Sequence, residues 1–257
     1  MEYLKSNCSD IKEIKIGDIP LVVIEPKEKT NKTLVFYHGW GSDVERQIFR
    51  GNIFASYGYR VILPEARYHG ERKDIDLDYG DEEVEGKYIL KVIMHNIEEA
   101  PMIFRYIGEN YPETEIAVGG HSMGAITAGG LYAFKKDLKM AFIYNGINNW
   151  HELVKGVNQL KNQEKIDERE FRINEFFLDM DPMESPEAFK DRPIVLYNGK
   201  DDEVIDPSGQ ESFAKEIEKV YDDKKLLDFQ LFEMTAHQVT TQMIEESIKF
   251  SKEIGRF

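Results

Sequence analysis

The sequence predicts a single α/β domain built on a mostly parallel sheet of about eight strands. Three observations carry this prediction. Short apolar runs rich in β-branched and aromatic residues recur along the 257 residues. Segments with helical spacing lie between these runs, and this alternation is typical of βαβ units whose sheet is covered on both faces. Most of the runs are continuously apolar, as expected of strands buried on both sides.

The strands follow from the position of these runs. The first two, residues 11–16 and 19–24, are separated only by Gly17-Asp18, which predicts a hairpin. The remaining strands are expected at residues 33–37, 60–63, 115–118, 140–144, 194–197 and 227–232.

The helices are expected between the strands, where apolar residues recur at helical spacing. Pro101 falls inside the second helix and should kink or split it, because proline lacks the backbone N–H that a helix interior uses. The expected helices are residues 44–57, 82–110, 125–136, 208–220 and 240–254.

One stretch interrupts the alternation. Residues 148–191 contain no convincing strand but two helical pieces, 150–160 and 167–178, followed by Asp181-Pro182 and Ser185-Pro186. An insertion this long in an α/β domain usually has a function or is mobile. We therefore expect one domain over residues 1–257 with a small helical cap at 148–191, lying over the carboxyl edge of the sheet; a poorly ordered surface excursion is the alternative.

Composition excludes several classes of partner. The formal net charge of −15 argues against nucleic-acid binding, which needs a basic surface, and against anionic membranes. Cys8 is the single cysteine, so no intramolecular disulfide can form, as is usual in a reducing compartment. Residues 1–6 have no apolar signal-peptide core, and no run approaches the ~18 apolar residues of a membrane helix. We expect a cytoplasmic protein.

The strongest chemical signal is the pattern Gly120-x-Ser122-x-Gly124. It follows a predicted strand and precedes a predicted helix, which is the context of a nucleophile elbow. In such a turn the glycines leave room for the backbone, and the serine hydroxyl lies at a helix N-terminus, where the dipole favours developing negative charge. Ser122 is therefore the predicted nucleophile, and a glycine turn needed only for packing is the alternative.

A second signal, His38-Gly39-Trp40-Gly41, directly follows the strand expected at 33–37. Acyl transfer generates an oxyanion that needs preorganised backbone donors. We expect these donors to be the amide of Met123, just after the nucleophile, and the amide of Trp40 in the earlier loop. The side chains of Trp40 and Trp150 are expected to contribute to a compact apolar substrate pocket. An ordinary glycine turn with a core tryptophan is the alternative for this loop.

Two further loops supply an acid and a base. His237 follows the last predicted strand, where it can reach a nucleophile on a neighbouring strand. Asp201, Asp202 and Asp206 compete for the carboxylate that orients this histidine, and Asp202 is preferred because Gly199 leaves room for a turn before it. The chain order serine, aspartate, histidine is the order that this arrangement requires in an α/β hydrolase.

The other histidines are weaker candidates for a catalytic role. His38 and His69 each precede a glycine in a turn and are expected to stabilise their loops by hydrogen bonds. His121 is expected to pack beside the nucleophile, and His151 could contact substrate from the cap. No histidine pair has zinc-ligand spacing and no phosphate-binding glycine loop is present, so neither a metal nor a cofactor is expected.

These motifs resemble the α/β-hydrolase superfamily, and more narrowly the bacterial single-domain serine carboxylesterases of the dienelactone-hydrolase and prolyl-oligopeptidase-like branch. The resemblance covers nearly the whole chain and rests on residues 38–41, 64–70, 120–124, 199–204 and 237. Many relatives have aspartate where this chain has Glu65 and proline where it has Asp206. Dienelactone hydrolases typically use cysteine as nucleophile, so the serine here favours an esterase.

The resemblance implies an α/β-hydrolase fold and a serine hydrolase that cleaves small-molecule esters of short to medium acyl chain through an acyl-enzyme. Two alternatives remain open from the sequence. A serine peptidase or aminoacyl amidase would use the same three residues, and a catalytically inactive hydrolase fold would act as a binding module. The oligomeric state is not indicated.

Overall fold

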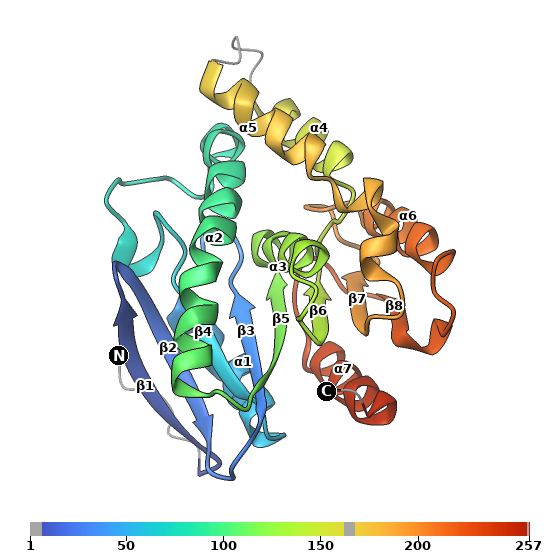
Figure 1. Cartoon of the computed structure of the whole chain (residues 1–257). Helices are drawn as coiled ribbons and strands as arrows, with labels where there is room; N and C mark the ends of the chain where they lie inside the picture. The colour runs from blue at the N-terminus through green and yellow to red at the C-terminus, as the bar shows by residue number, and fades with distance from the viewer. Residues whose placement is uncertain (1–6, 162–167, 256) are drawn as a thin grey trace.

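Eight strands form one sheet in the computed structural model, which describes residues 7–161, 168–255 and 257 (Figure 1). The strand order is β1-β2-β4-β3-β5-β6-β7-β8. The strands β3 to β8 pair with one another in parallel, so the sheet is mostly parallel as predicted. The strands are β1 (Ser9–Ile16), β2 (Ile19–Pro26), β3 (Lys32–Tyr37), β4 (Arg60–Pro64), β5 (Glu115–His121), β6 (Met140–Tyr144), β7 (Ile194–Gly199) and β8 (Leu227–Phe232).

The predicted hairpin joins β1 and β2, which pair antiparallel with Ile16 opposite Ile19. β2 is also antiparallel to β4, so the antiparallel part of the sheet is confined to one edge. β3 lies between β4 and β5, which places a change of direction in strand order between β3 and β5. Ligands of open α/β sheets bind outside the carboxyl ends of the strands at such a point.

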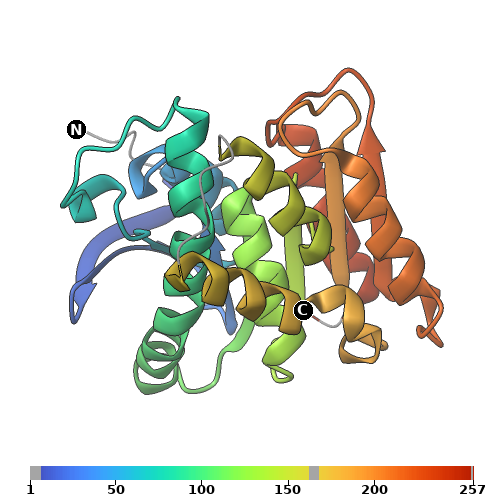
Figure 2. The same cartoon turned by 90° about the horizontal axis from the view of Figure 1, so that it is seen from above.

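Helices cover both faces of the sheet (Figure 2). On one face α1 (Val44–Ser56) and α7 (Thr241–Ile254) pack against side chains such as Leu34 and Phe36 of β3. On the other face α2 (Glu82–Asn110), α3 (Met123–Phe134) and α6 (Pro207–Glu218) pack against the alternate side chains, Val35 and Tyr37. Residues of one strand thus enter two cores, which explains why the strands are continuously apolar.

Pro101 does not split its helix. α2 continues through it as one helix of 29 residues, so the split that the sequence offered as one outcome does not occur. Pro101 is exposed, whereas Ala100 and Ile103 on either side of it are buried against the sheet and α3. Burial of these flanking side chains outweighs the one backbone hydrogen bond that proline removes.

The segment 148–191 forms helices, as expected. α4 (Trp150–Leu160) and α5 (Glu168–Asp179) pack against α2 and are followed by two short 3₁₀ turns, Pro182–Glu184 and Pro186–Phe189. The first residue of the second expected helix, Asp167, lies outside the described residues. Asp181 is buried and accepts hydrogen bonds from the amides of Trp150 and His151, which joins the two ends of the segment.

No helix within residues 7–161 and 168–255 is long and apolar enough to cross a membrane. The expectation about a signal peptide concerns residues 1–6, which lie outside the described residues.

Candidate active site

Ser122 lies in a strained turn between β5 and α3. Its φ of 57° and ψ of −123° put a non-glycine residue in a region that costs of order 1–3 kcal/mol. A Cβ atom on Gly120 would lie 2.3 Å from backbone atoms of Gly124, and a Cβ on Gly124 would lie 2.1 Å from the Tyr37 carbonyl oxygen. Both glycines of the motif are therefore required by close backbone approach, as the sequence indicates.

Replacing Gly124 by alanine is expected to destabilise the fold by more than about 3 kcal/mol, because the added methyl group meets backbone that cannot move away. Gly108→Ala is the matched control. Nothing lies within 4 Å of a Cβ built at this position in α2, so the control should stabilise the protein by about 0.5–1 kcal/mol. Urea unfolding of both variants measures the difference, and equal stabilities would contradict the steric argument.

The structure brings Asp202 and His237 together. His237 Nδ1 lies 2.7 Å from Asp202 Oδ2, and the other carboxylate oxygen accepts hydrogen bonds from the amides of Val204 and Ile205, each at 2.9 Å. Burial alone would raise the pKa of Asp202, but the hydrogen bond from His237 and the two amides lower it overall. The carboxylate therefore stabilises the fold above its unfolded pKa of about 4, and this contribution is lost as pH falls through the folded value.

The two competing aspartates lie elsewhere. Asp201 is exposed, and its amide donates to the Thr235 carbonyl. Asp206 caps α6 by accepting from the Ser208 amide at 2.8 Å. Asp202 is thus the member of this group that contacts His237.

Close backbone contact joins the acid and base loops. A Cβ on Gly199 would lie 2.3 Å from the carbonyl oxygens of Thr235 and Ala236, so only glycine allows this approach. Asn145, at the end of β6, donates from Nδ2 to the Gln238 carbonyl and accepts the Gly199 amide at Oδ1. Its side chain therefore ties both loops to the central sheet, a role that sequence reasoning missed.

His237 also lies beside the elbow. Its ring is 4.9 Å from that of His121, the residue before Ser122, measured between centroids. Burial, and then a positive charge on His237, lower the pKa of His121 to about 3, so His121 stays neutral next to an imidazolium. Across the described residues, the contacts include the Asp202–His237 hydrogen bond but none from His237 to Ser122; such contacts often tighten only when substrate binds.

Two backbone amides are available near Ser122. Met123 is the first residue of α3, and the first amides of a helix have no intrahelical acceptor. The β3 loop lies against the elbow: a Cβ on Gly39 would be 3.3 Å from Ser122 Cβ. In this loop the amides of Gly41 and Ser42 donate to His69 Nε2 and the Gly39 carbonyl, respectively. Within the part of the chain that the structure describes, no acceptor is recorded for the Trp40 amide between them.

Known proteins are similar to this chain along nearly its whole length. The chain is 25% identical over 251 residues to "Putative esterase YitV" of Bacillus subtilis, covering 91% of this chain and 95% of the relative. It is 25% identical over 255 residues to "Esterase YjfP" of Escherichia coli, covering 95% and 98%. The crystal structure of TT1662 from Thermus thermophilus superimposes with a TM-score of 0.79 at 17% identity, over 95% of this chain and 97% of the other. The chain has the α/β-hydrolase fold. No protein-family model matches it.

A cavity of about 680 Å³ opens at Ser122 of the hydrolase. Its apolar wall comes from α2, α3, α4 and the loops after β6 and β7, and includes Ile89, Ile126, Ile147, Leu153, Val157, Leu160 and Ile205. Four acidic residues and one lysine also line it: Glu85, Glu152, Glu203, Asp206 and Lys155. Lys155 is paired with Glu152 at 3.0 Å, which leaves the cavity with an excess of negative charge.

The structure brings neither tryptophan side chain into this cavity, so the expected substrate contacts need correction. Trp150 is fully buried, with its ring 4.9 Å from that of Phe177, and anchors α4 to α5. The Trp40 indole packs against His69 and Tyr79 and donates from Nε1 to the Tyr79 carbonyl. Both indoles pack against neighbouring side chains, Trp150 fully buried and Trp40 half-buried.

Glu85 is a cavity residue that the sequence did not reveal. It belongs to the first turns of α2, more than a hundred residues from His237 along the chain, and no local motif marks it. Its side chain is half-buried, and burial raises its pKa against the opposing attraction of His237. His151, by contrast, is paired with Asp181 at 2.6 Å and does not line the cavity.

No cluster of three or more histidine, cysteine, aspartate or glutamate side chains able to hold a metal ion occurs in residues 7–161 and 168–255.

Proposed function

We propose that the protein is a serine hydrolase that cleaves carboxylic esters through an acyl-enzyme on Ser122. The observation that carries this proposal is the hydrogen bond of 2.7 Å between His237 and Asp202, beside a serine held in a nucleophile elbow. The two relatives named as esterases, which match over more than nine tenths of the chain, support the same reaction.

The reaction proceeds in two halves. His237 Nε2 removes the proton from Ser122 as its oxygen attacks the ester carbonyl, while Asp202 stabilises the imidazolium that forms. The amides of Trp40 and Met123 hold the oxyanion of the tetrahedral intermediate. His237 then gives its proton to the leaving alcohol, and water repeats the sequence to release the acid.

The cavity supports a small substrate. Ser122 is only 7% exposed, and aliphatic side chains of α2, α3 and α4 form part of the cavity wall beside it. We therefore expect p-nitrophenyl acetate and butyrate to be turned over faster than palmitate, measured as kcat/KM across the acyl series. A preference for palmitate would contradict the short-chain proposal, and absence of both turnover and fluorophosphonate labelling would instead favour a binding module. Faster turnover of aminoacyl amides than of esters would favour a peptidase.

Glu85 is expected to select against anionic acyl groups. Half-esters of dicarboxylic acids should react at least about tenfold more slowly than neutral esters of equal length, because their free carboxylate is repelled by the acidic residues that line the cavity. Glu85→Gln should reduce the ratio of kcat/KM between neutral esters and half-esters, while kcat/KM for neutral esters stays nearly unchanged. Glu184→Gln, outside the cavity lining, is the matched control, and an unchanged ratio in Glu85→Gln would refute the assignment.

A small-molecule ester is the partner that this proposal requires. The net charge of −15 supports the absence of nucleic-acid partners. The lone cysteine, Cys8, supports a cytoplasmic location, where thiols stay reduced.

A further inference from the structure

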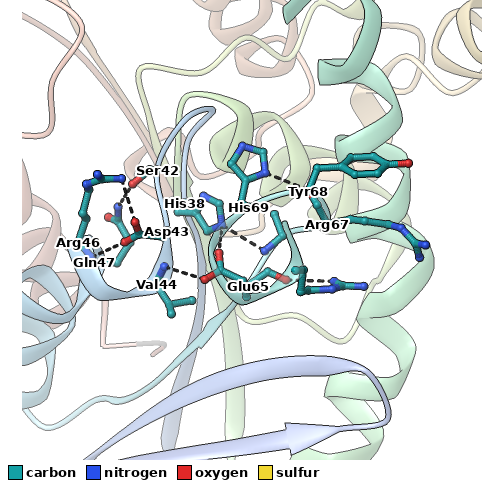
Figure 3. Close-up of polar contacts among 12 residues, drawn as sticks. His38, Ser42, Asp43, Val44, Arg46, Gln47, Glu65, Arg67, Tyr68 and His69 are labelled. Carbon is teal, nitrogen blue, oxygen red and sulfur yellow. Dashed lines mark hydrogen bonds and ion pairs between the residues drawn. The ribbon is translucent and has the colours of Figure 1, made fainter. Parts of the chain in front are cut away.

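Two buried imidazoles, His38 and His69, contact the loop that carries the Trp40 amide, and Figure 3 shows both rings together with Glu65. His38 Nδ1 lies 2.8 Å from the Gly39 carbonyl oxygen, and this oxygen also accepts the Ser42 amide at 3.2 Å. His69 Nε2 accepts the Gly41 amide at 3.2 Å. The peptide groups on both sides of Trp40 are therefore fixed by side chains that are almost completely buried.

Both ring nitrogens of His38 face polar atoms. Glu65 Oε1 lies 2.9 Å from His38 Nε2, and both side chains are at most 2% exposed. The carboxyl group of Glu65 is therefore in direct contact with the ring. The Ala66 amide also contacts Nε2, at 3.1 Å. Since Nδ1 faces a carbonyl oxygen, it must carry a hydrogen and donate it.

Glu65 is itself enclosed. A Cβ on Gly70 would lie 1.9 Å from Glu65 Oε2, and the Arg72 guanidinium donates to the Glu65 backbone carbonyl at 3.1 Å. The carboxyl group therefore cannot turn away from His38 without displacing backbone. A fixed carboxyl fixes the ring, and the ring fixes the Gly39 carbonyl.

The Gly39 carbonyl and the Trp40 amide belong to one peptide group. The described chain has no cis peptide bond, so in this trans peptide the N–H points opposite to the carbonyl. Holding the carbonyl toward His38 directs the Trp40 N–H away from that ring, within a loop whose backbone lies against Ser122. A flip of this peptide would replace the donor with a carbonyl oxygen.

We propose that His38, held by Glu65, is a positioning residue that aims the Trp40 amide at the oxyanion. The inference rests on the proposed esterase function and adds a residue pair that does not touch substrate. Its chemical consequence is confined to the tetrahedral intermediate, because the planar ester carbonyl makes weaker demands on the donor.

A pair of variants separates positioning from packing. In His38→Asn the amide nitrogen takes the place of Nδ1 and keeps the Gly39 contact, whereas in His38→Gln it takes the place of Nε2 and keeps only the Glu65 contact. We expect kcat for p-nitrophenyl butyrate to fall about 100-fold in His38→Gln and less than about 10-fold in His38→Asn, with KM within threefold of wild type in both. Affinity for a trifluoromethyl ketone, which forms a tetrahedral adduct, should fall in parallel with kcat.

Equal losses of kcat in the two variants, or losses expressed in KM, would overturn the inference. If neither variant folds, Glu65→Gln and Glu65→Met decide: glutamine can still donate to His38 Nε2 and should keep kcat, whereas methionine should lose it about tenfold or more. An equal effect of these two would also overturn it. Failure of the esterase function itself would be seen separately, as absence of turnover by the wild-type protein.

Discussion

Replacing Ser122 by alanine is expected to lower kcat for p-nitrophenyl acetate by roughly a millionfold, to the rate left by binding and the backbone donors alone. The reason is that no other nucleophile lies at the elbow, where β5 and α3 meet. Burst kinetics and the intact mass after fluorophosphonate treatment measure the loss. The wild-type protein should gain one adduct, and Ser122→Ala should gain none.

Ser212 is a suitable control for this substitution. It lines the same cavity, and its hydroxyl donates to the Gly209 carbonyl at 2.8 Å, so it is occupied in α6. Ser212→Ala should therefore keep both the adduct and nearly all turnover. Wild-type turnover by Ser122→Ala, or an adduct mapped to Ser212, would refute the assignment of the nucleophile.

Substituting Asp202 by asparagine should lower kcat by about 10⁴-fold, because an amide opposite Nδ1 stabilises the wrong tautomer of His237. The substitution keeps the size of the side chain, and the Val204 and Ile205 amides still find an oxygen acceptor at this position. A large loss of activity with a small change in melting temperature is the expected pattern.

Asp201→Asn provides the matched control for this experiment. The two aspartates are adjacent in sequence, but Asp201 is exposed and Asp202 is only 6% exposed. The control should retain activity within about threefold, since surface substitutions have small effects. Comparable losses in the two variants would mean that the loop as a whole, rather than the carboxylate on His237, supports the reaction.

The fold could be predicted from the sequence because each buried strand is visible as a short, continuously apolar run. β6 and β8 begin and end where the apolar runs do, at 140–144 and 227–232. The glycines around Ser122 were equally informative, since their spacing reflects close contacts that no side chain would permit. These features depend on local sequence, so one chain is enough to reveal them.

Other features depend on packing between distant segments. The prediction that Trp40 and Trp150 line the pocket was wrong, because the sequence does not distinguish a tryptophan of the core from one of a pocket. Glu85 and Asn145 gave no signal, because the cavity that Glu85 lines and the loops that Asn145 holds are assembled only in the folded chain. Pro101 was overestimated as a helix breaker since burial of its neighbours could not be known.

The reacting residues and much of the cavity wall come from different segments of the chain, and this has an evolutionary consequence. Ser122, Asp202 and His237, the proposed reacting residues, follow β5, β7 and β8, whereas much of the cavity wall comes from α4. A lineage could therefore diversify the helical segment to accept new acids or alcohols while the reacting groups stayed untouched. Exchanging this segment between two such hydrolases would be a direct way to transplant selectivity.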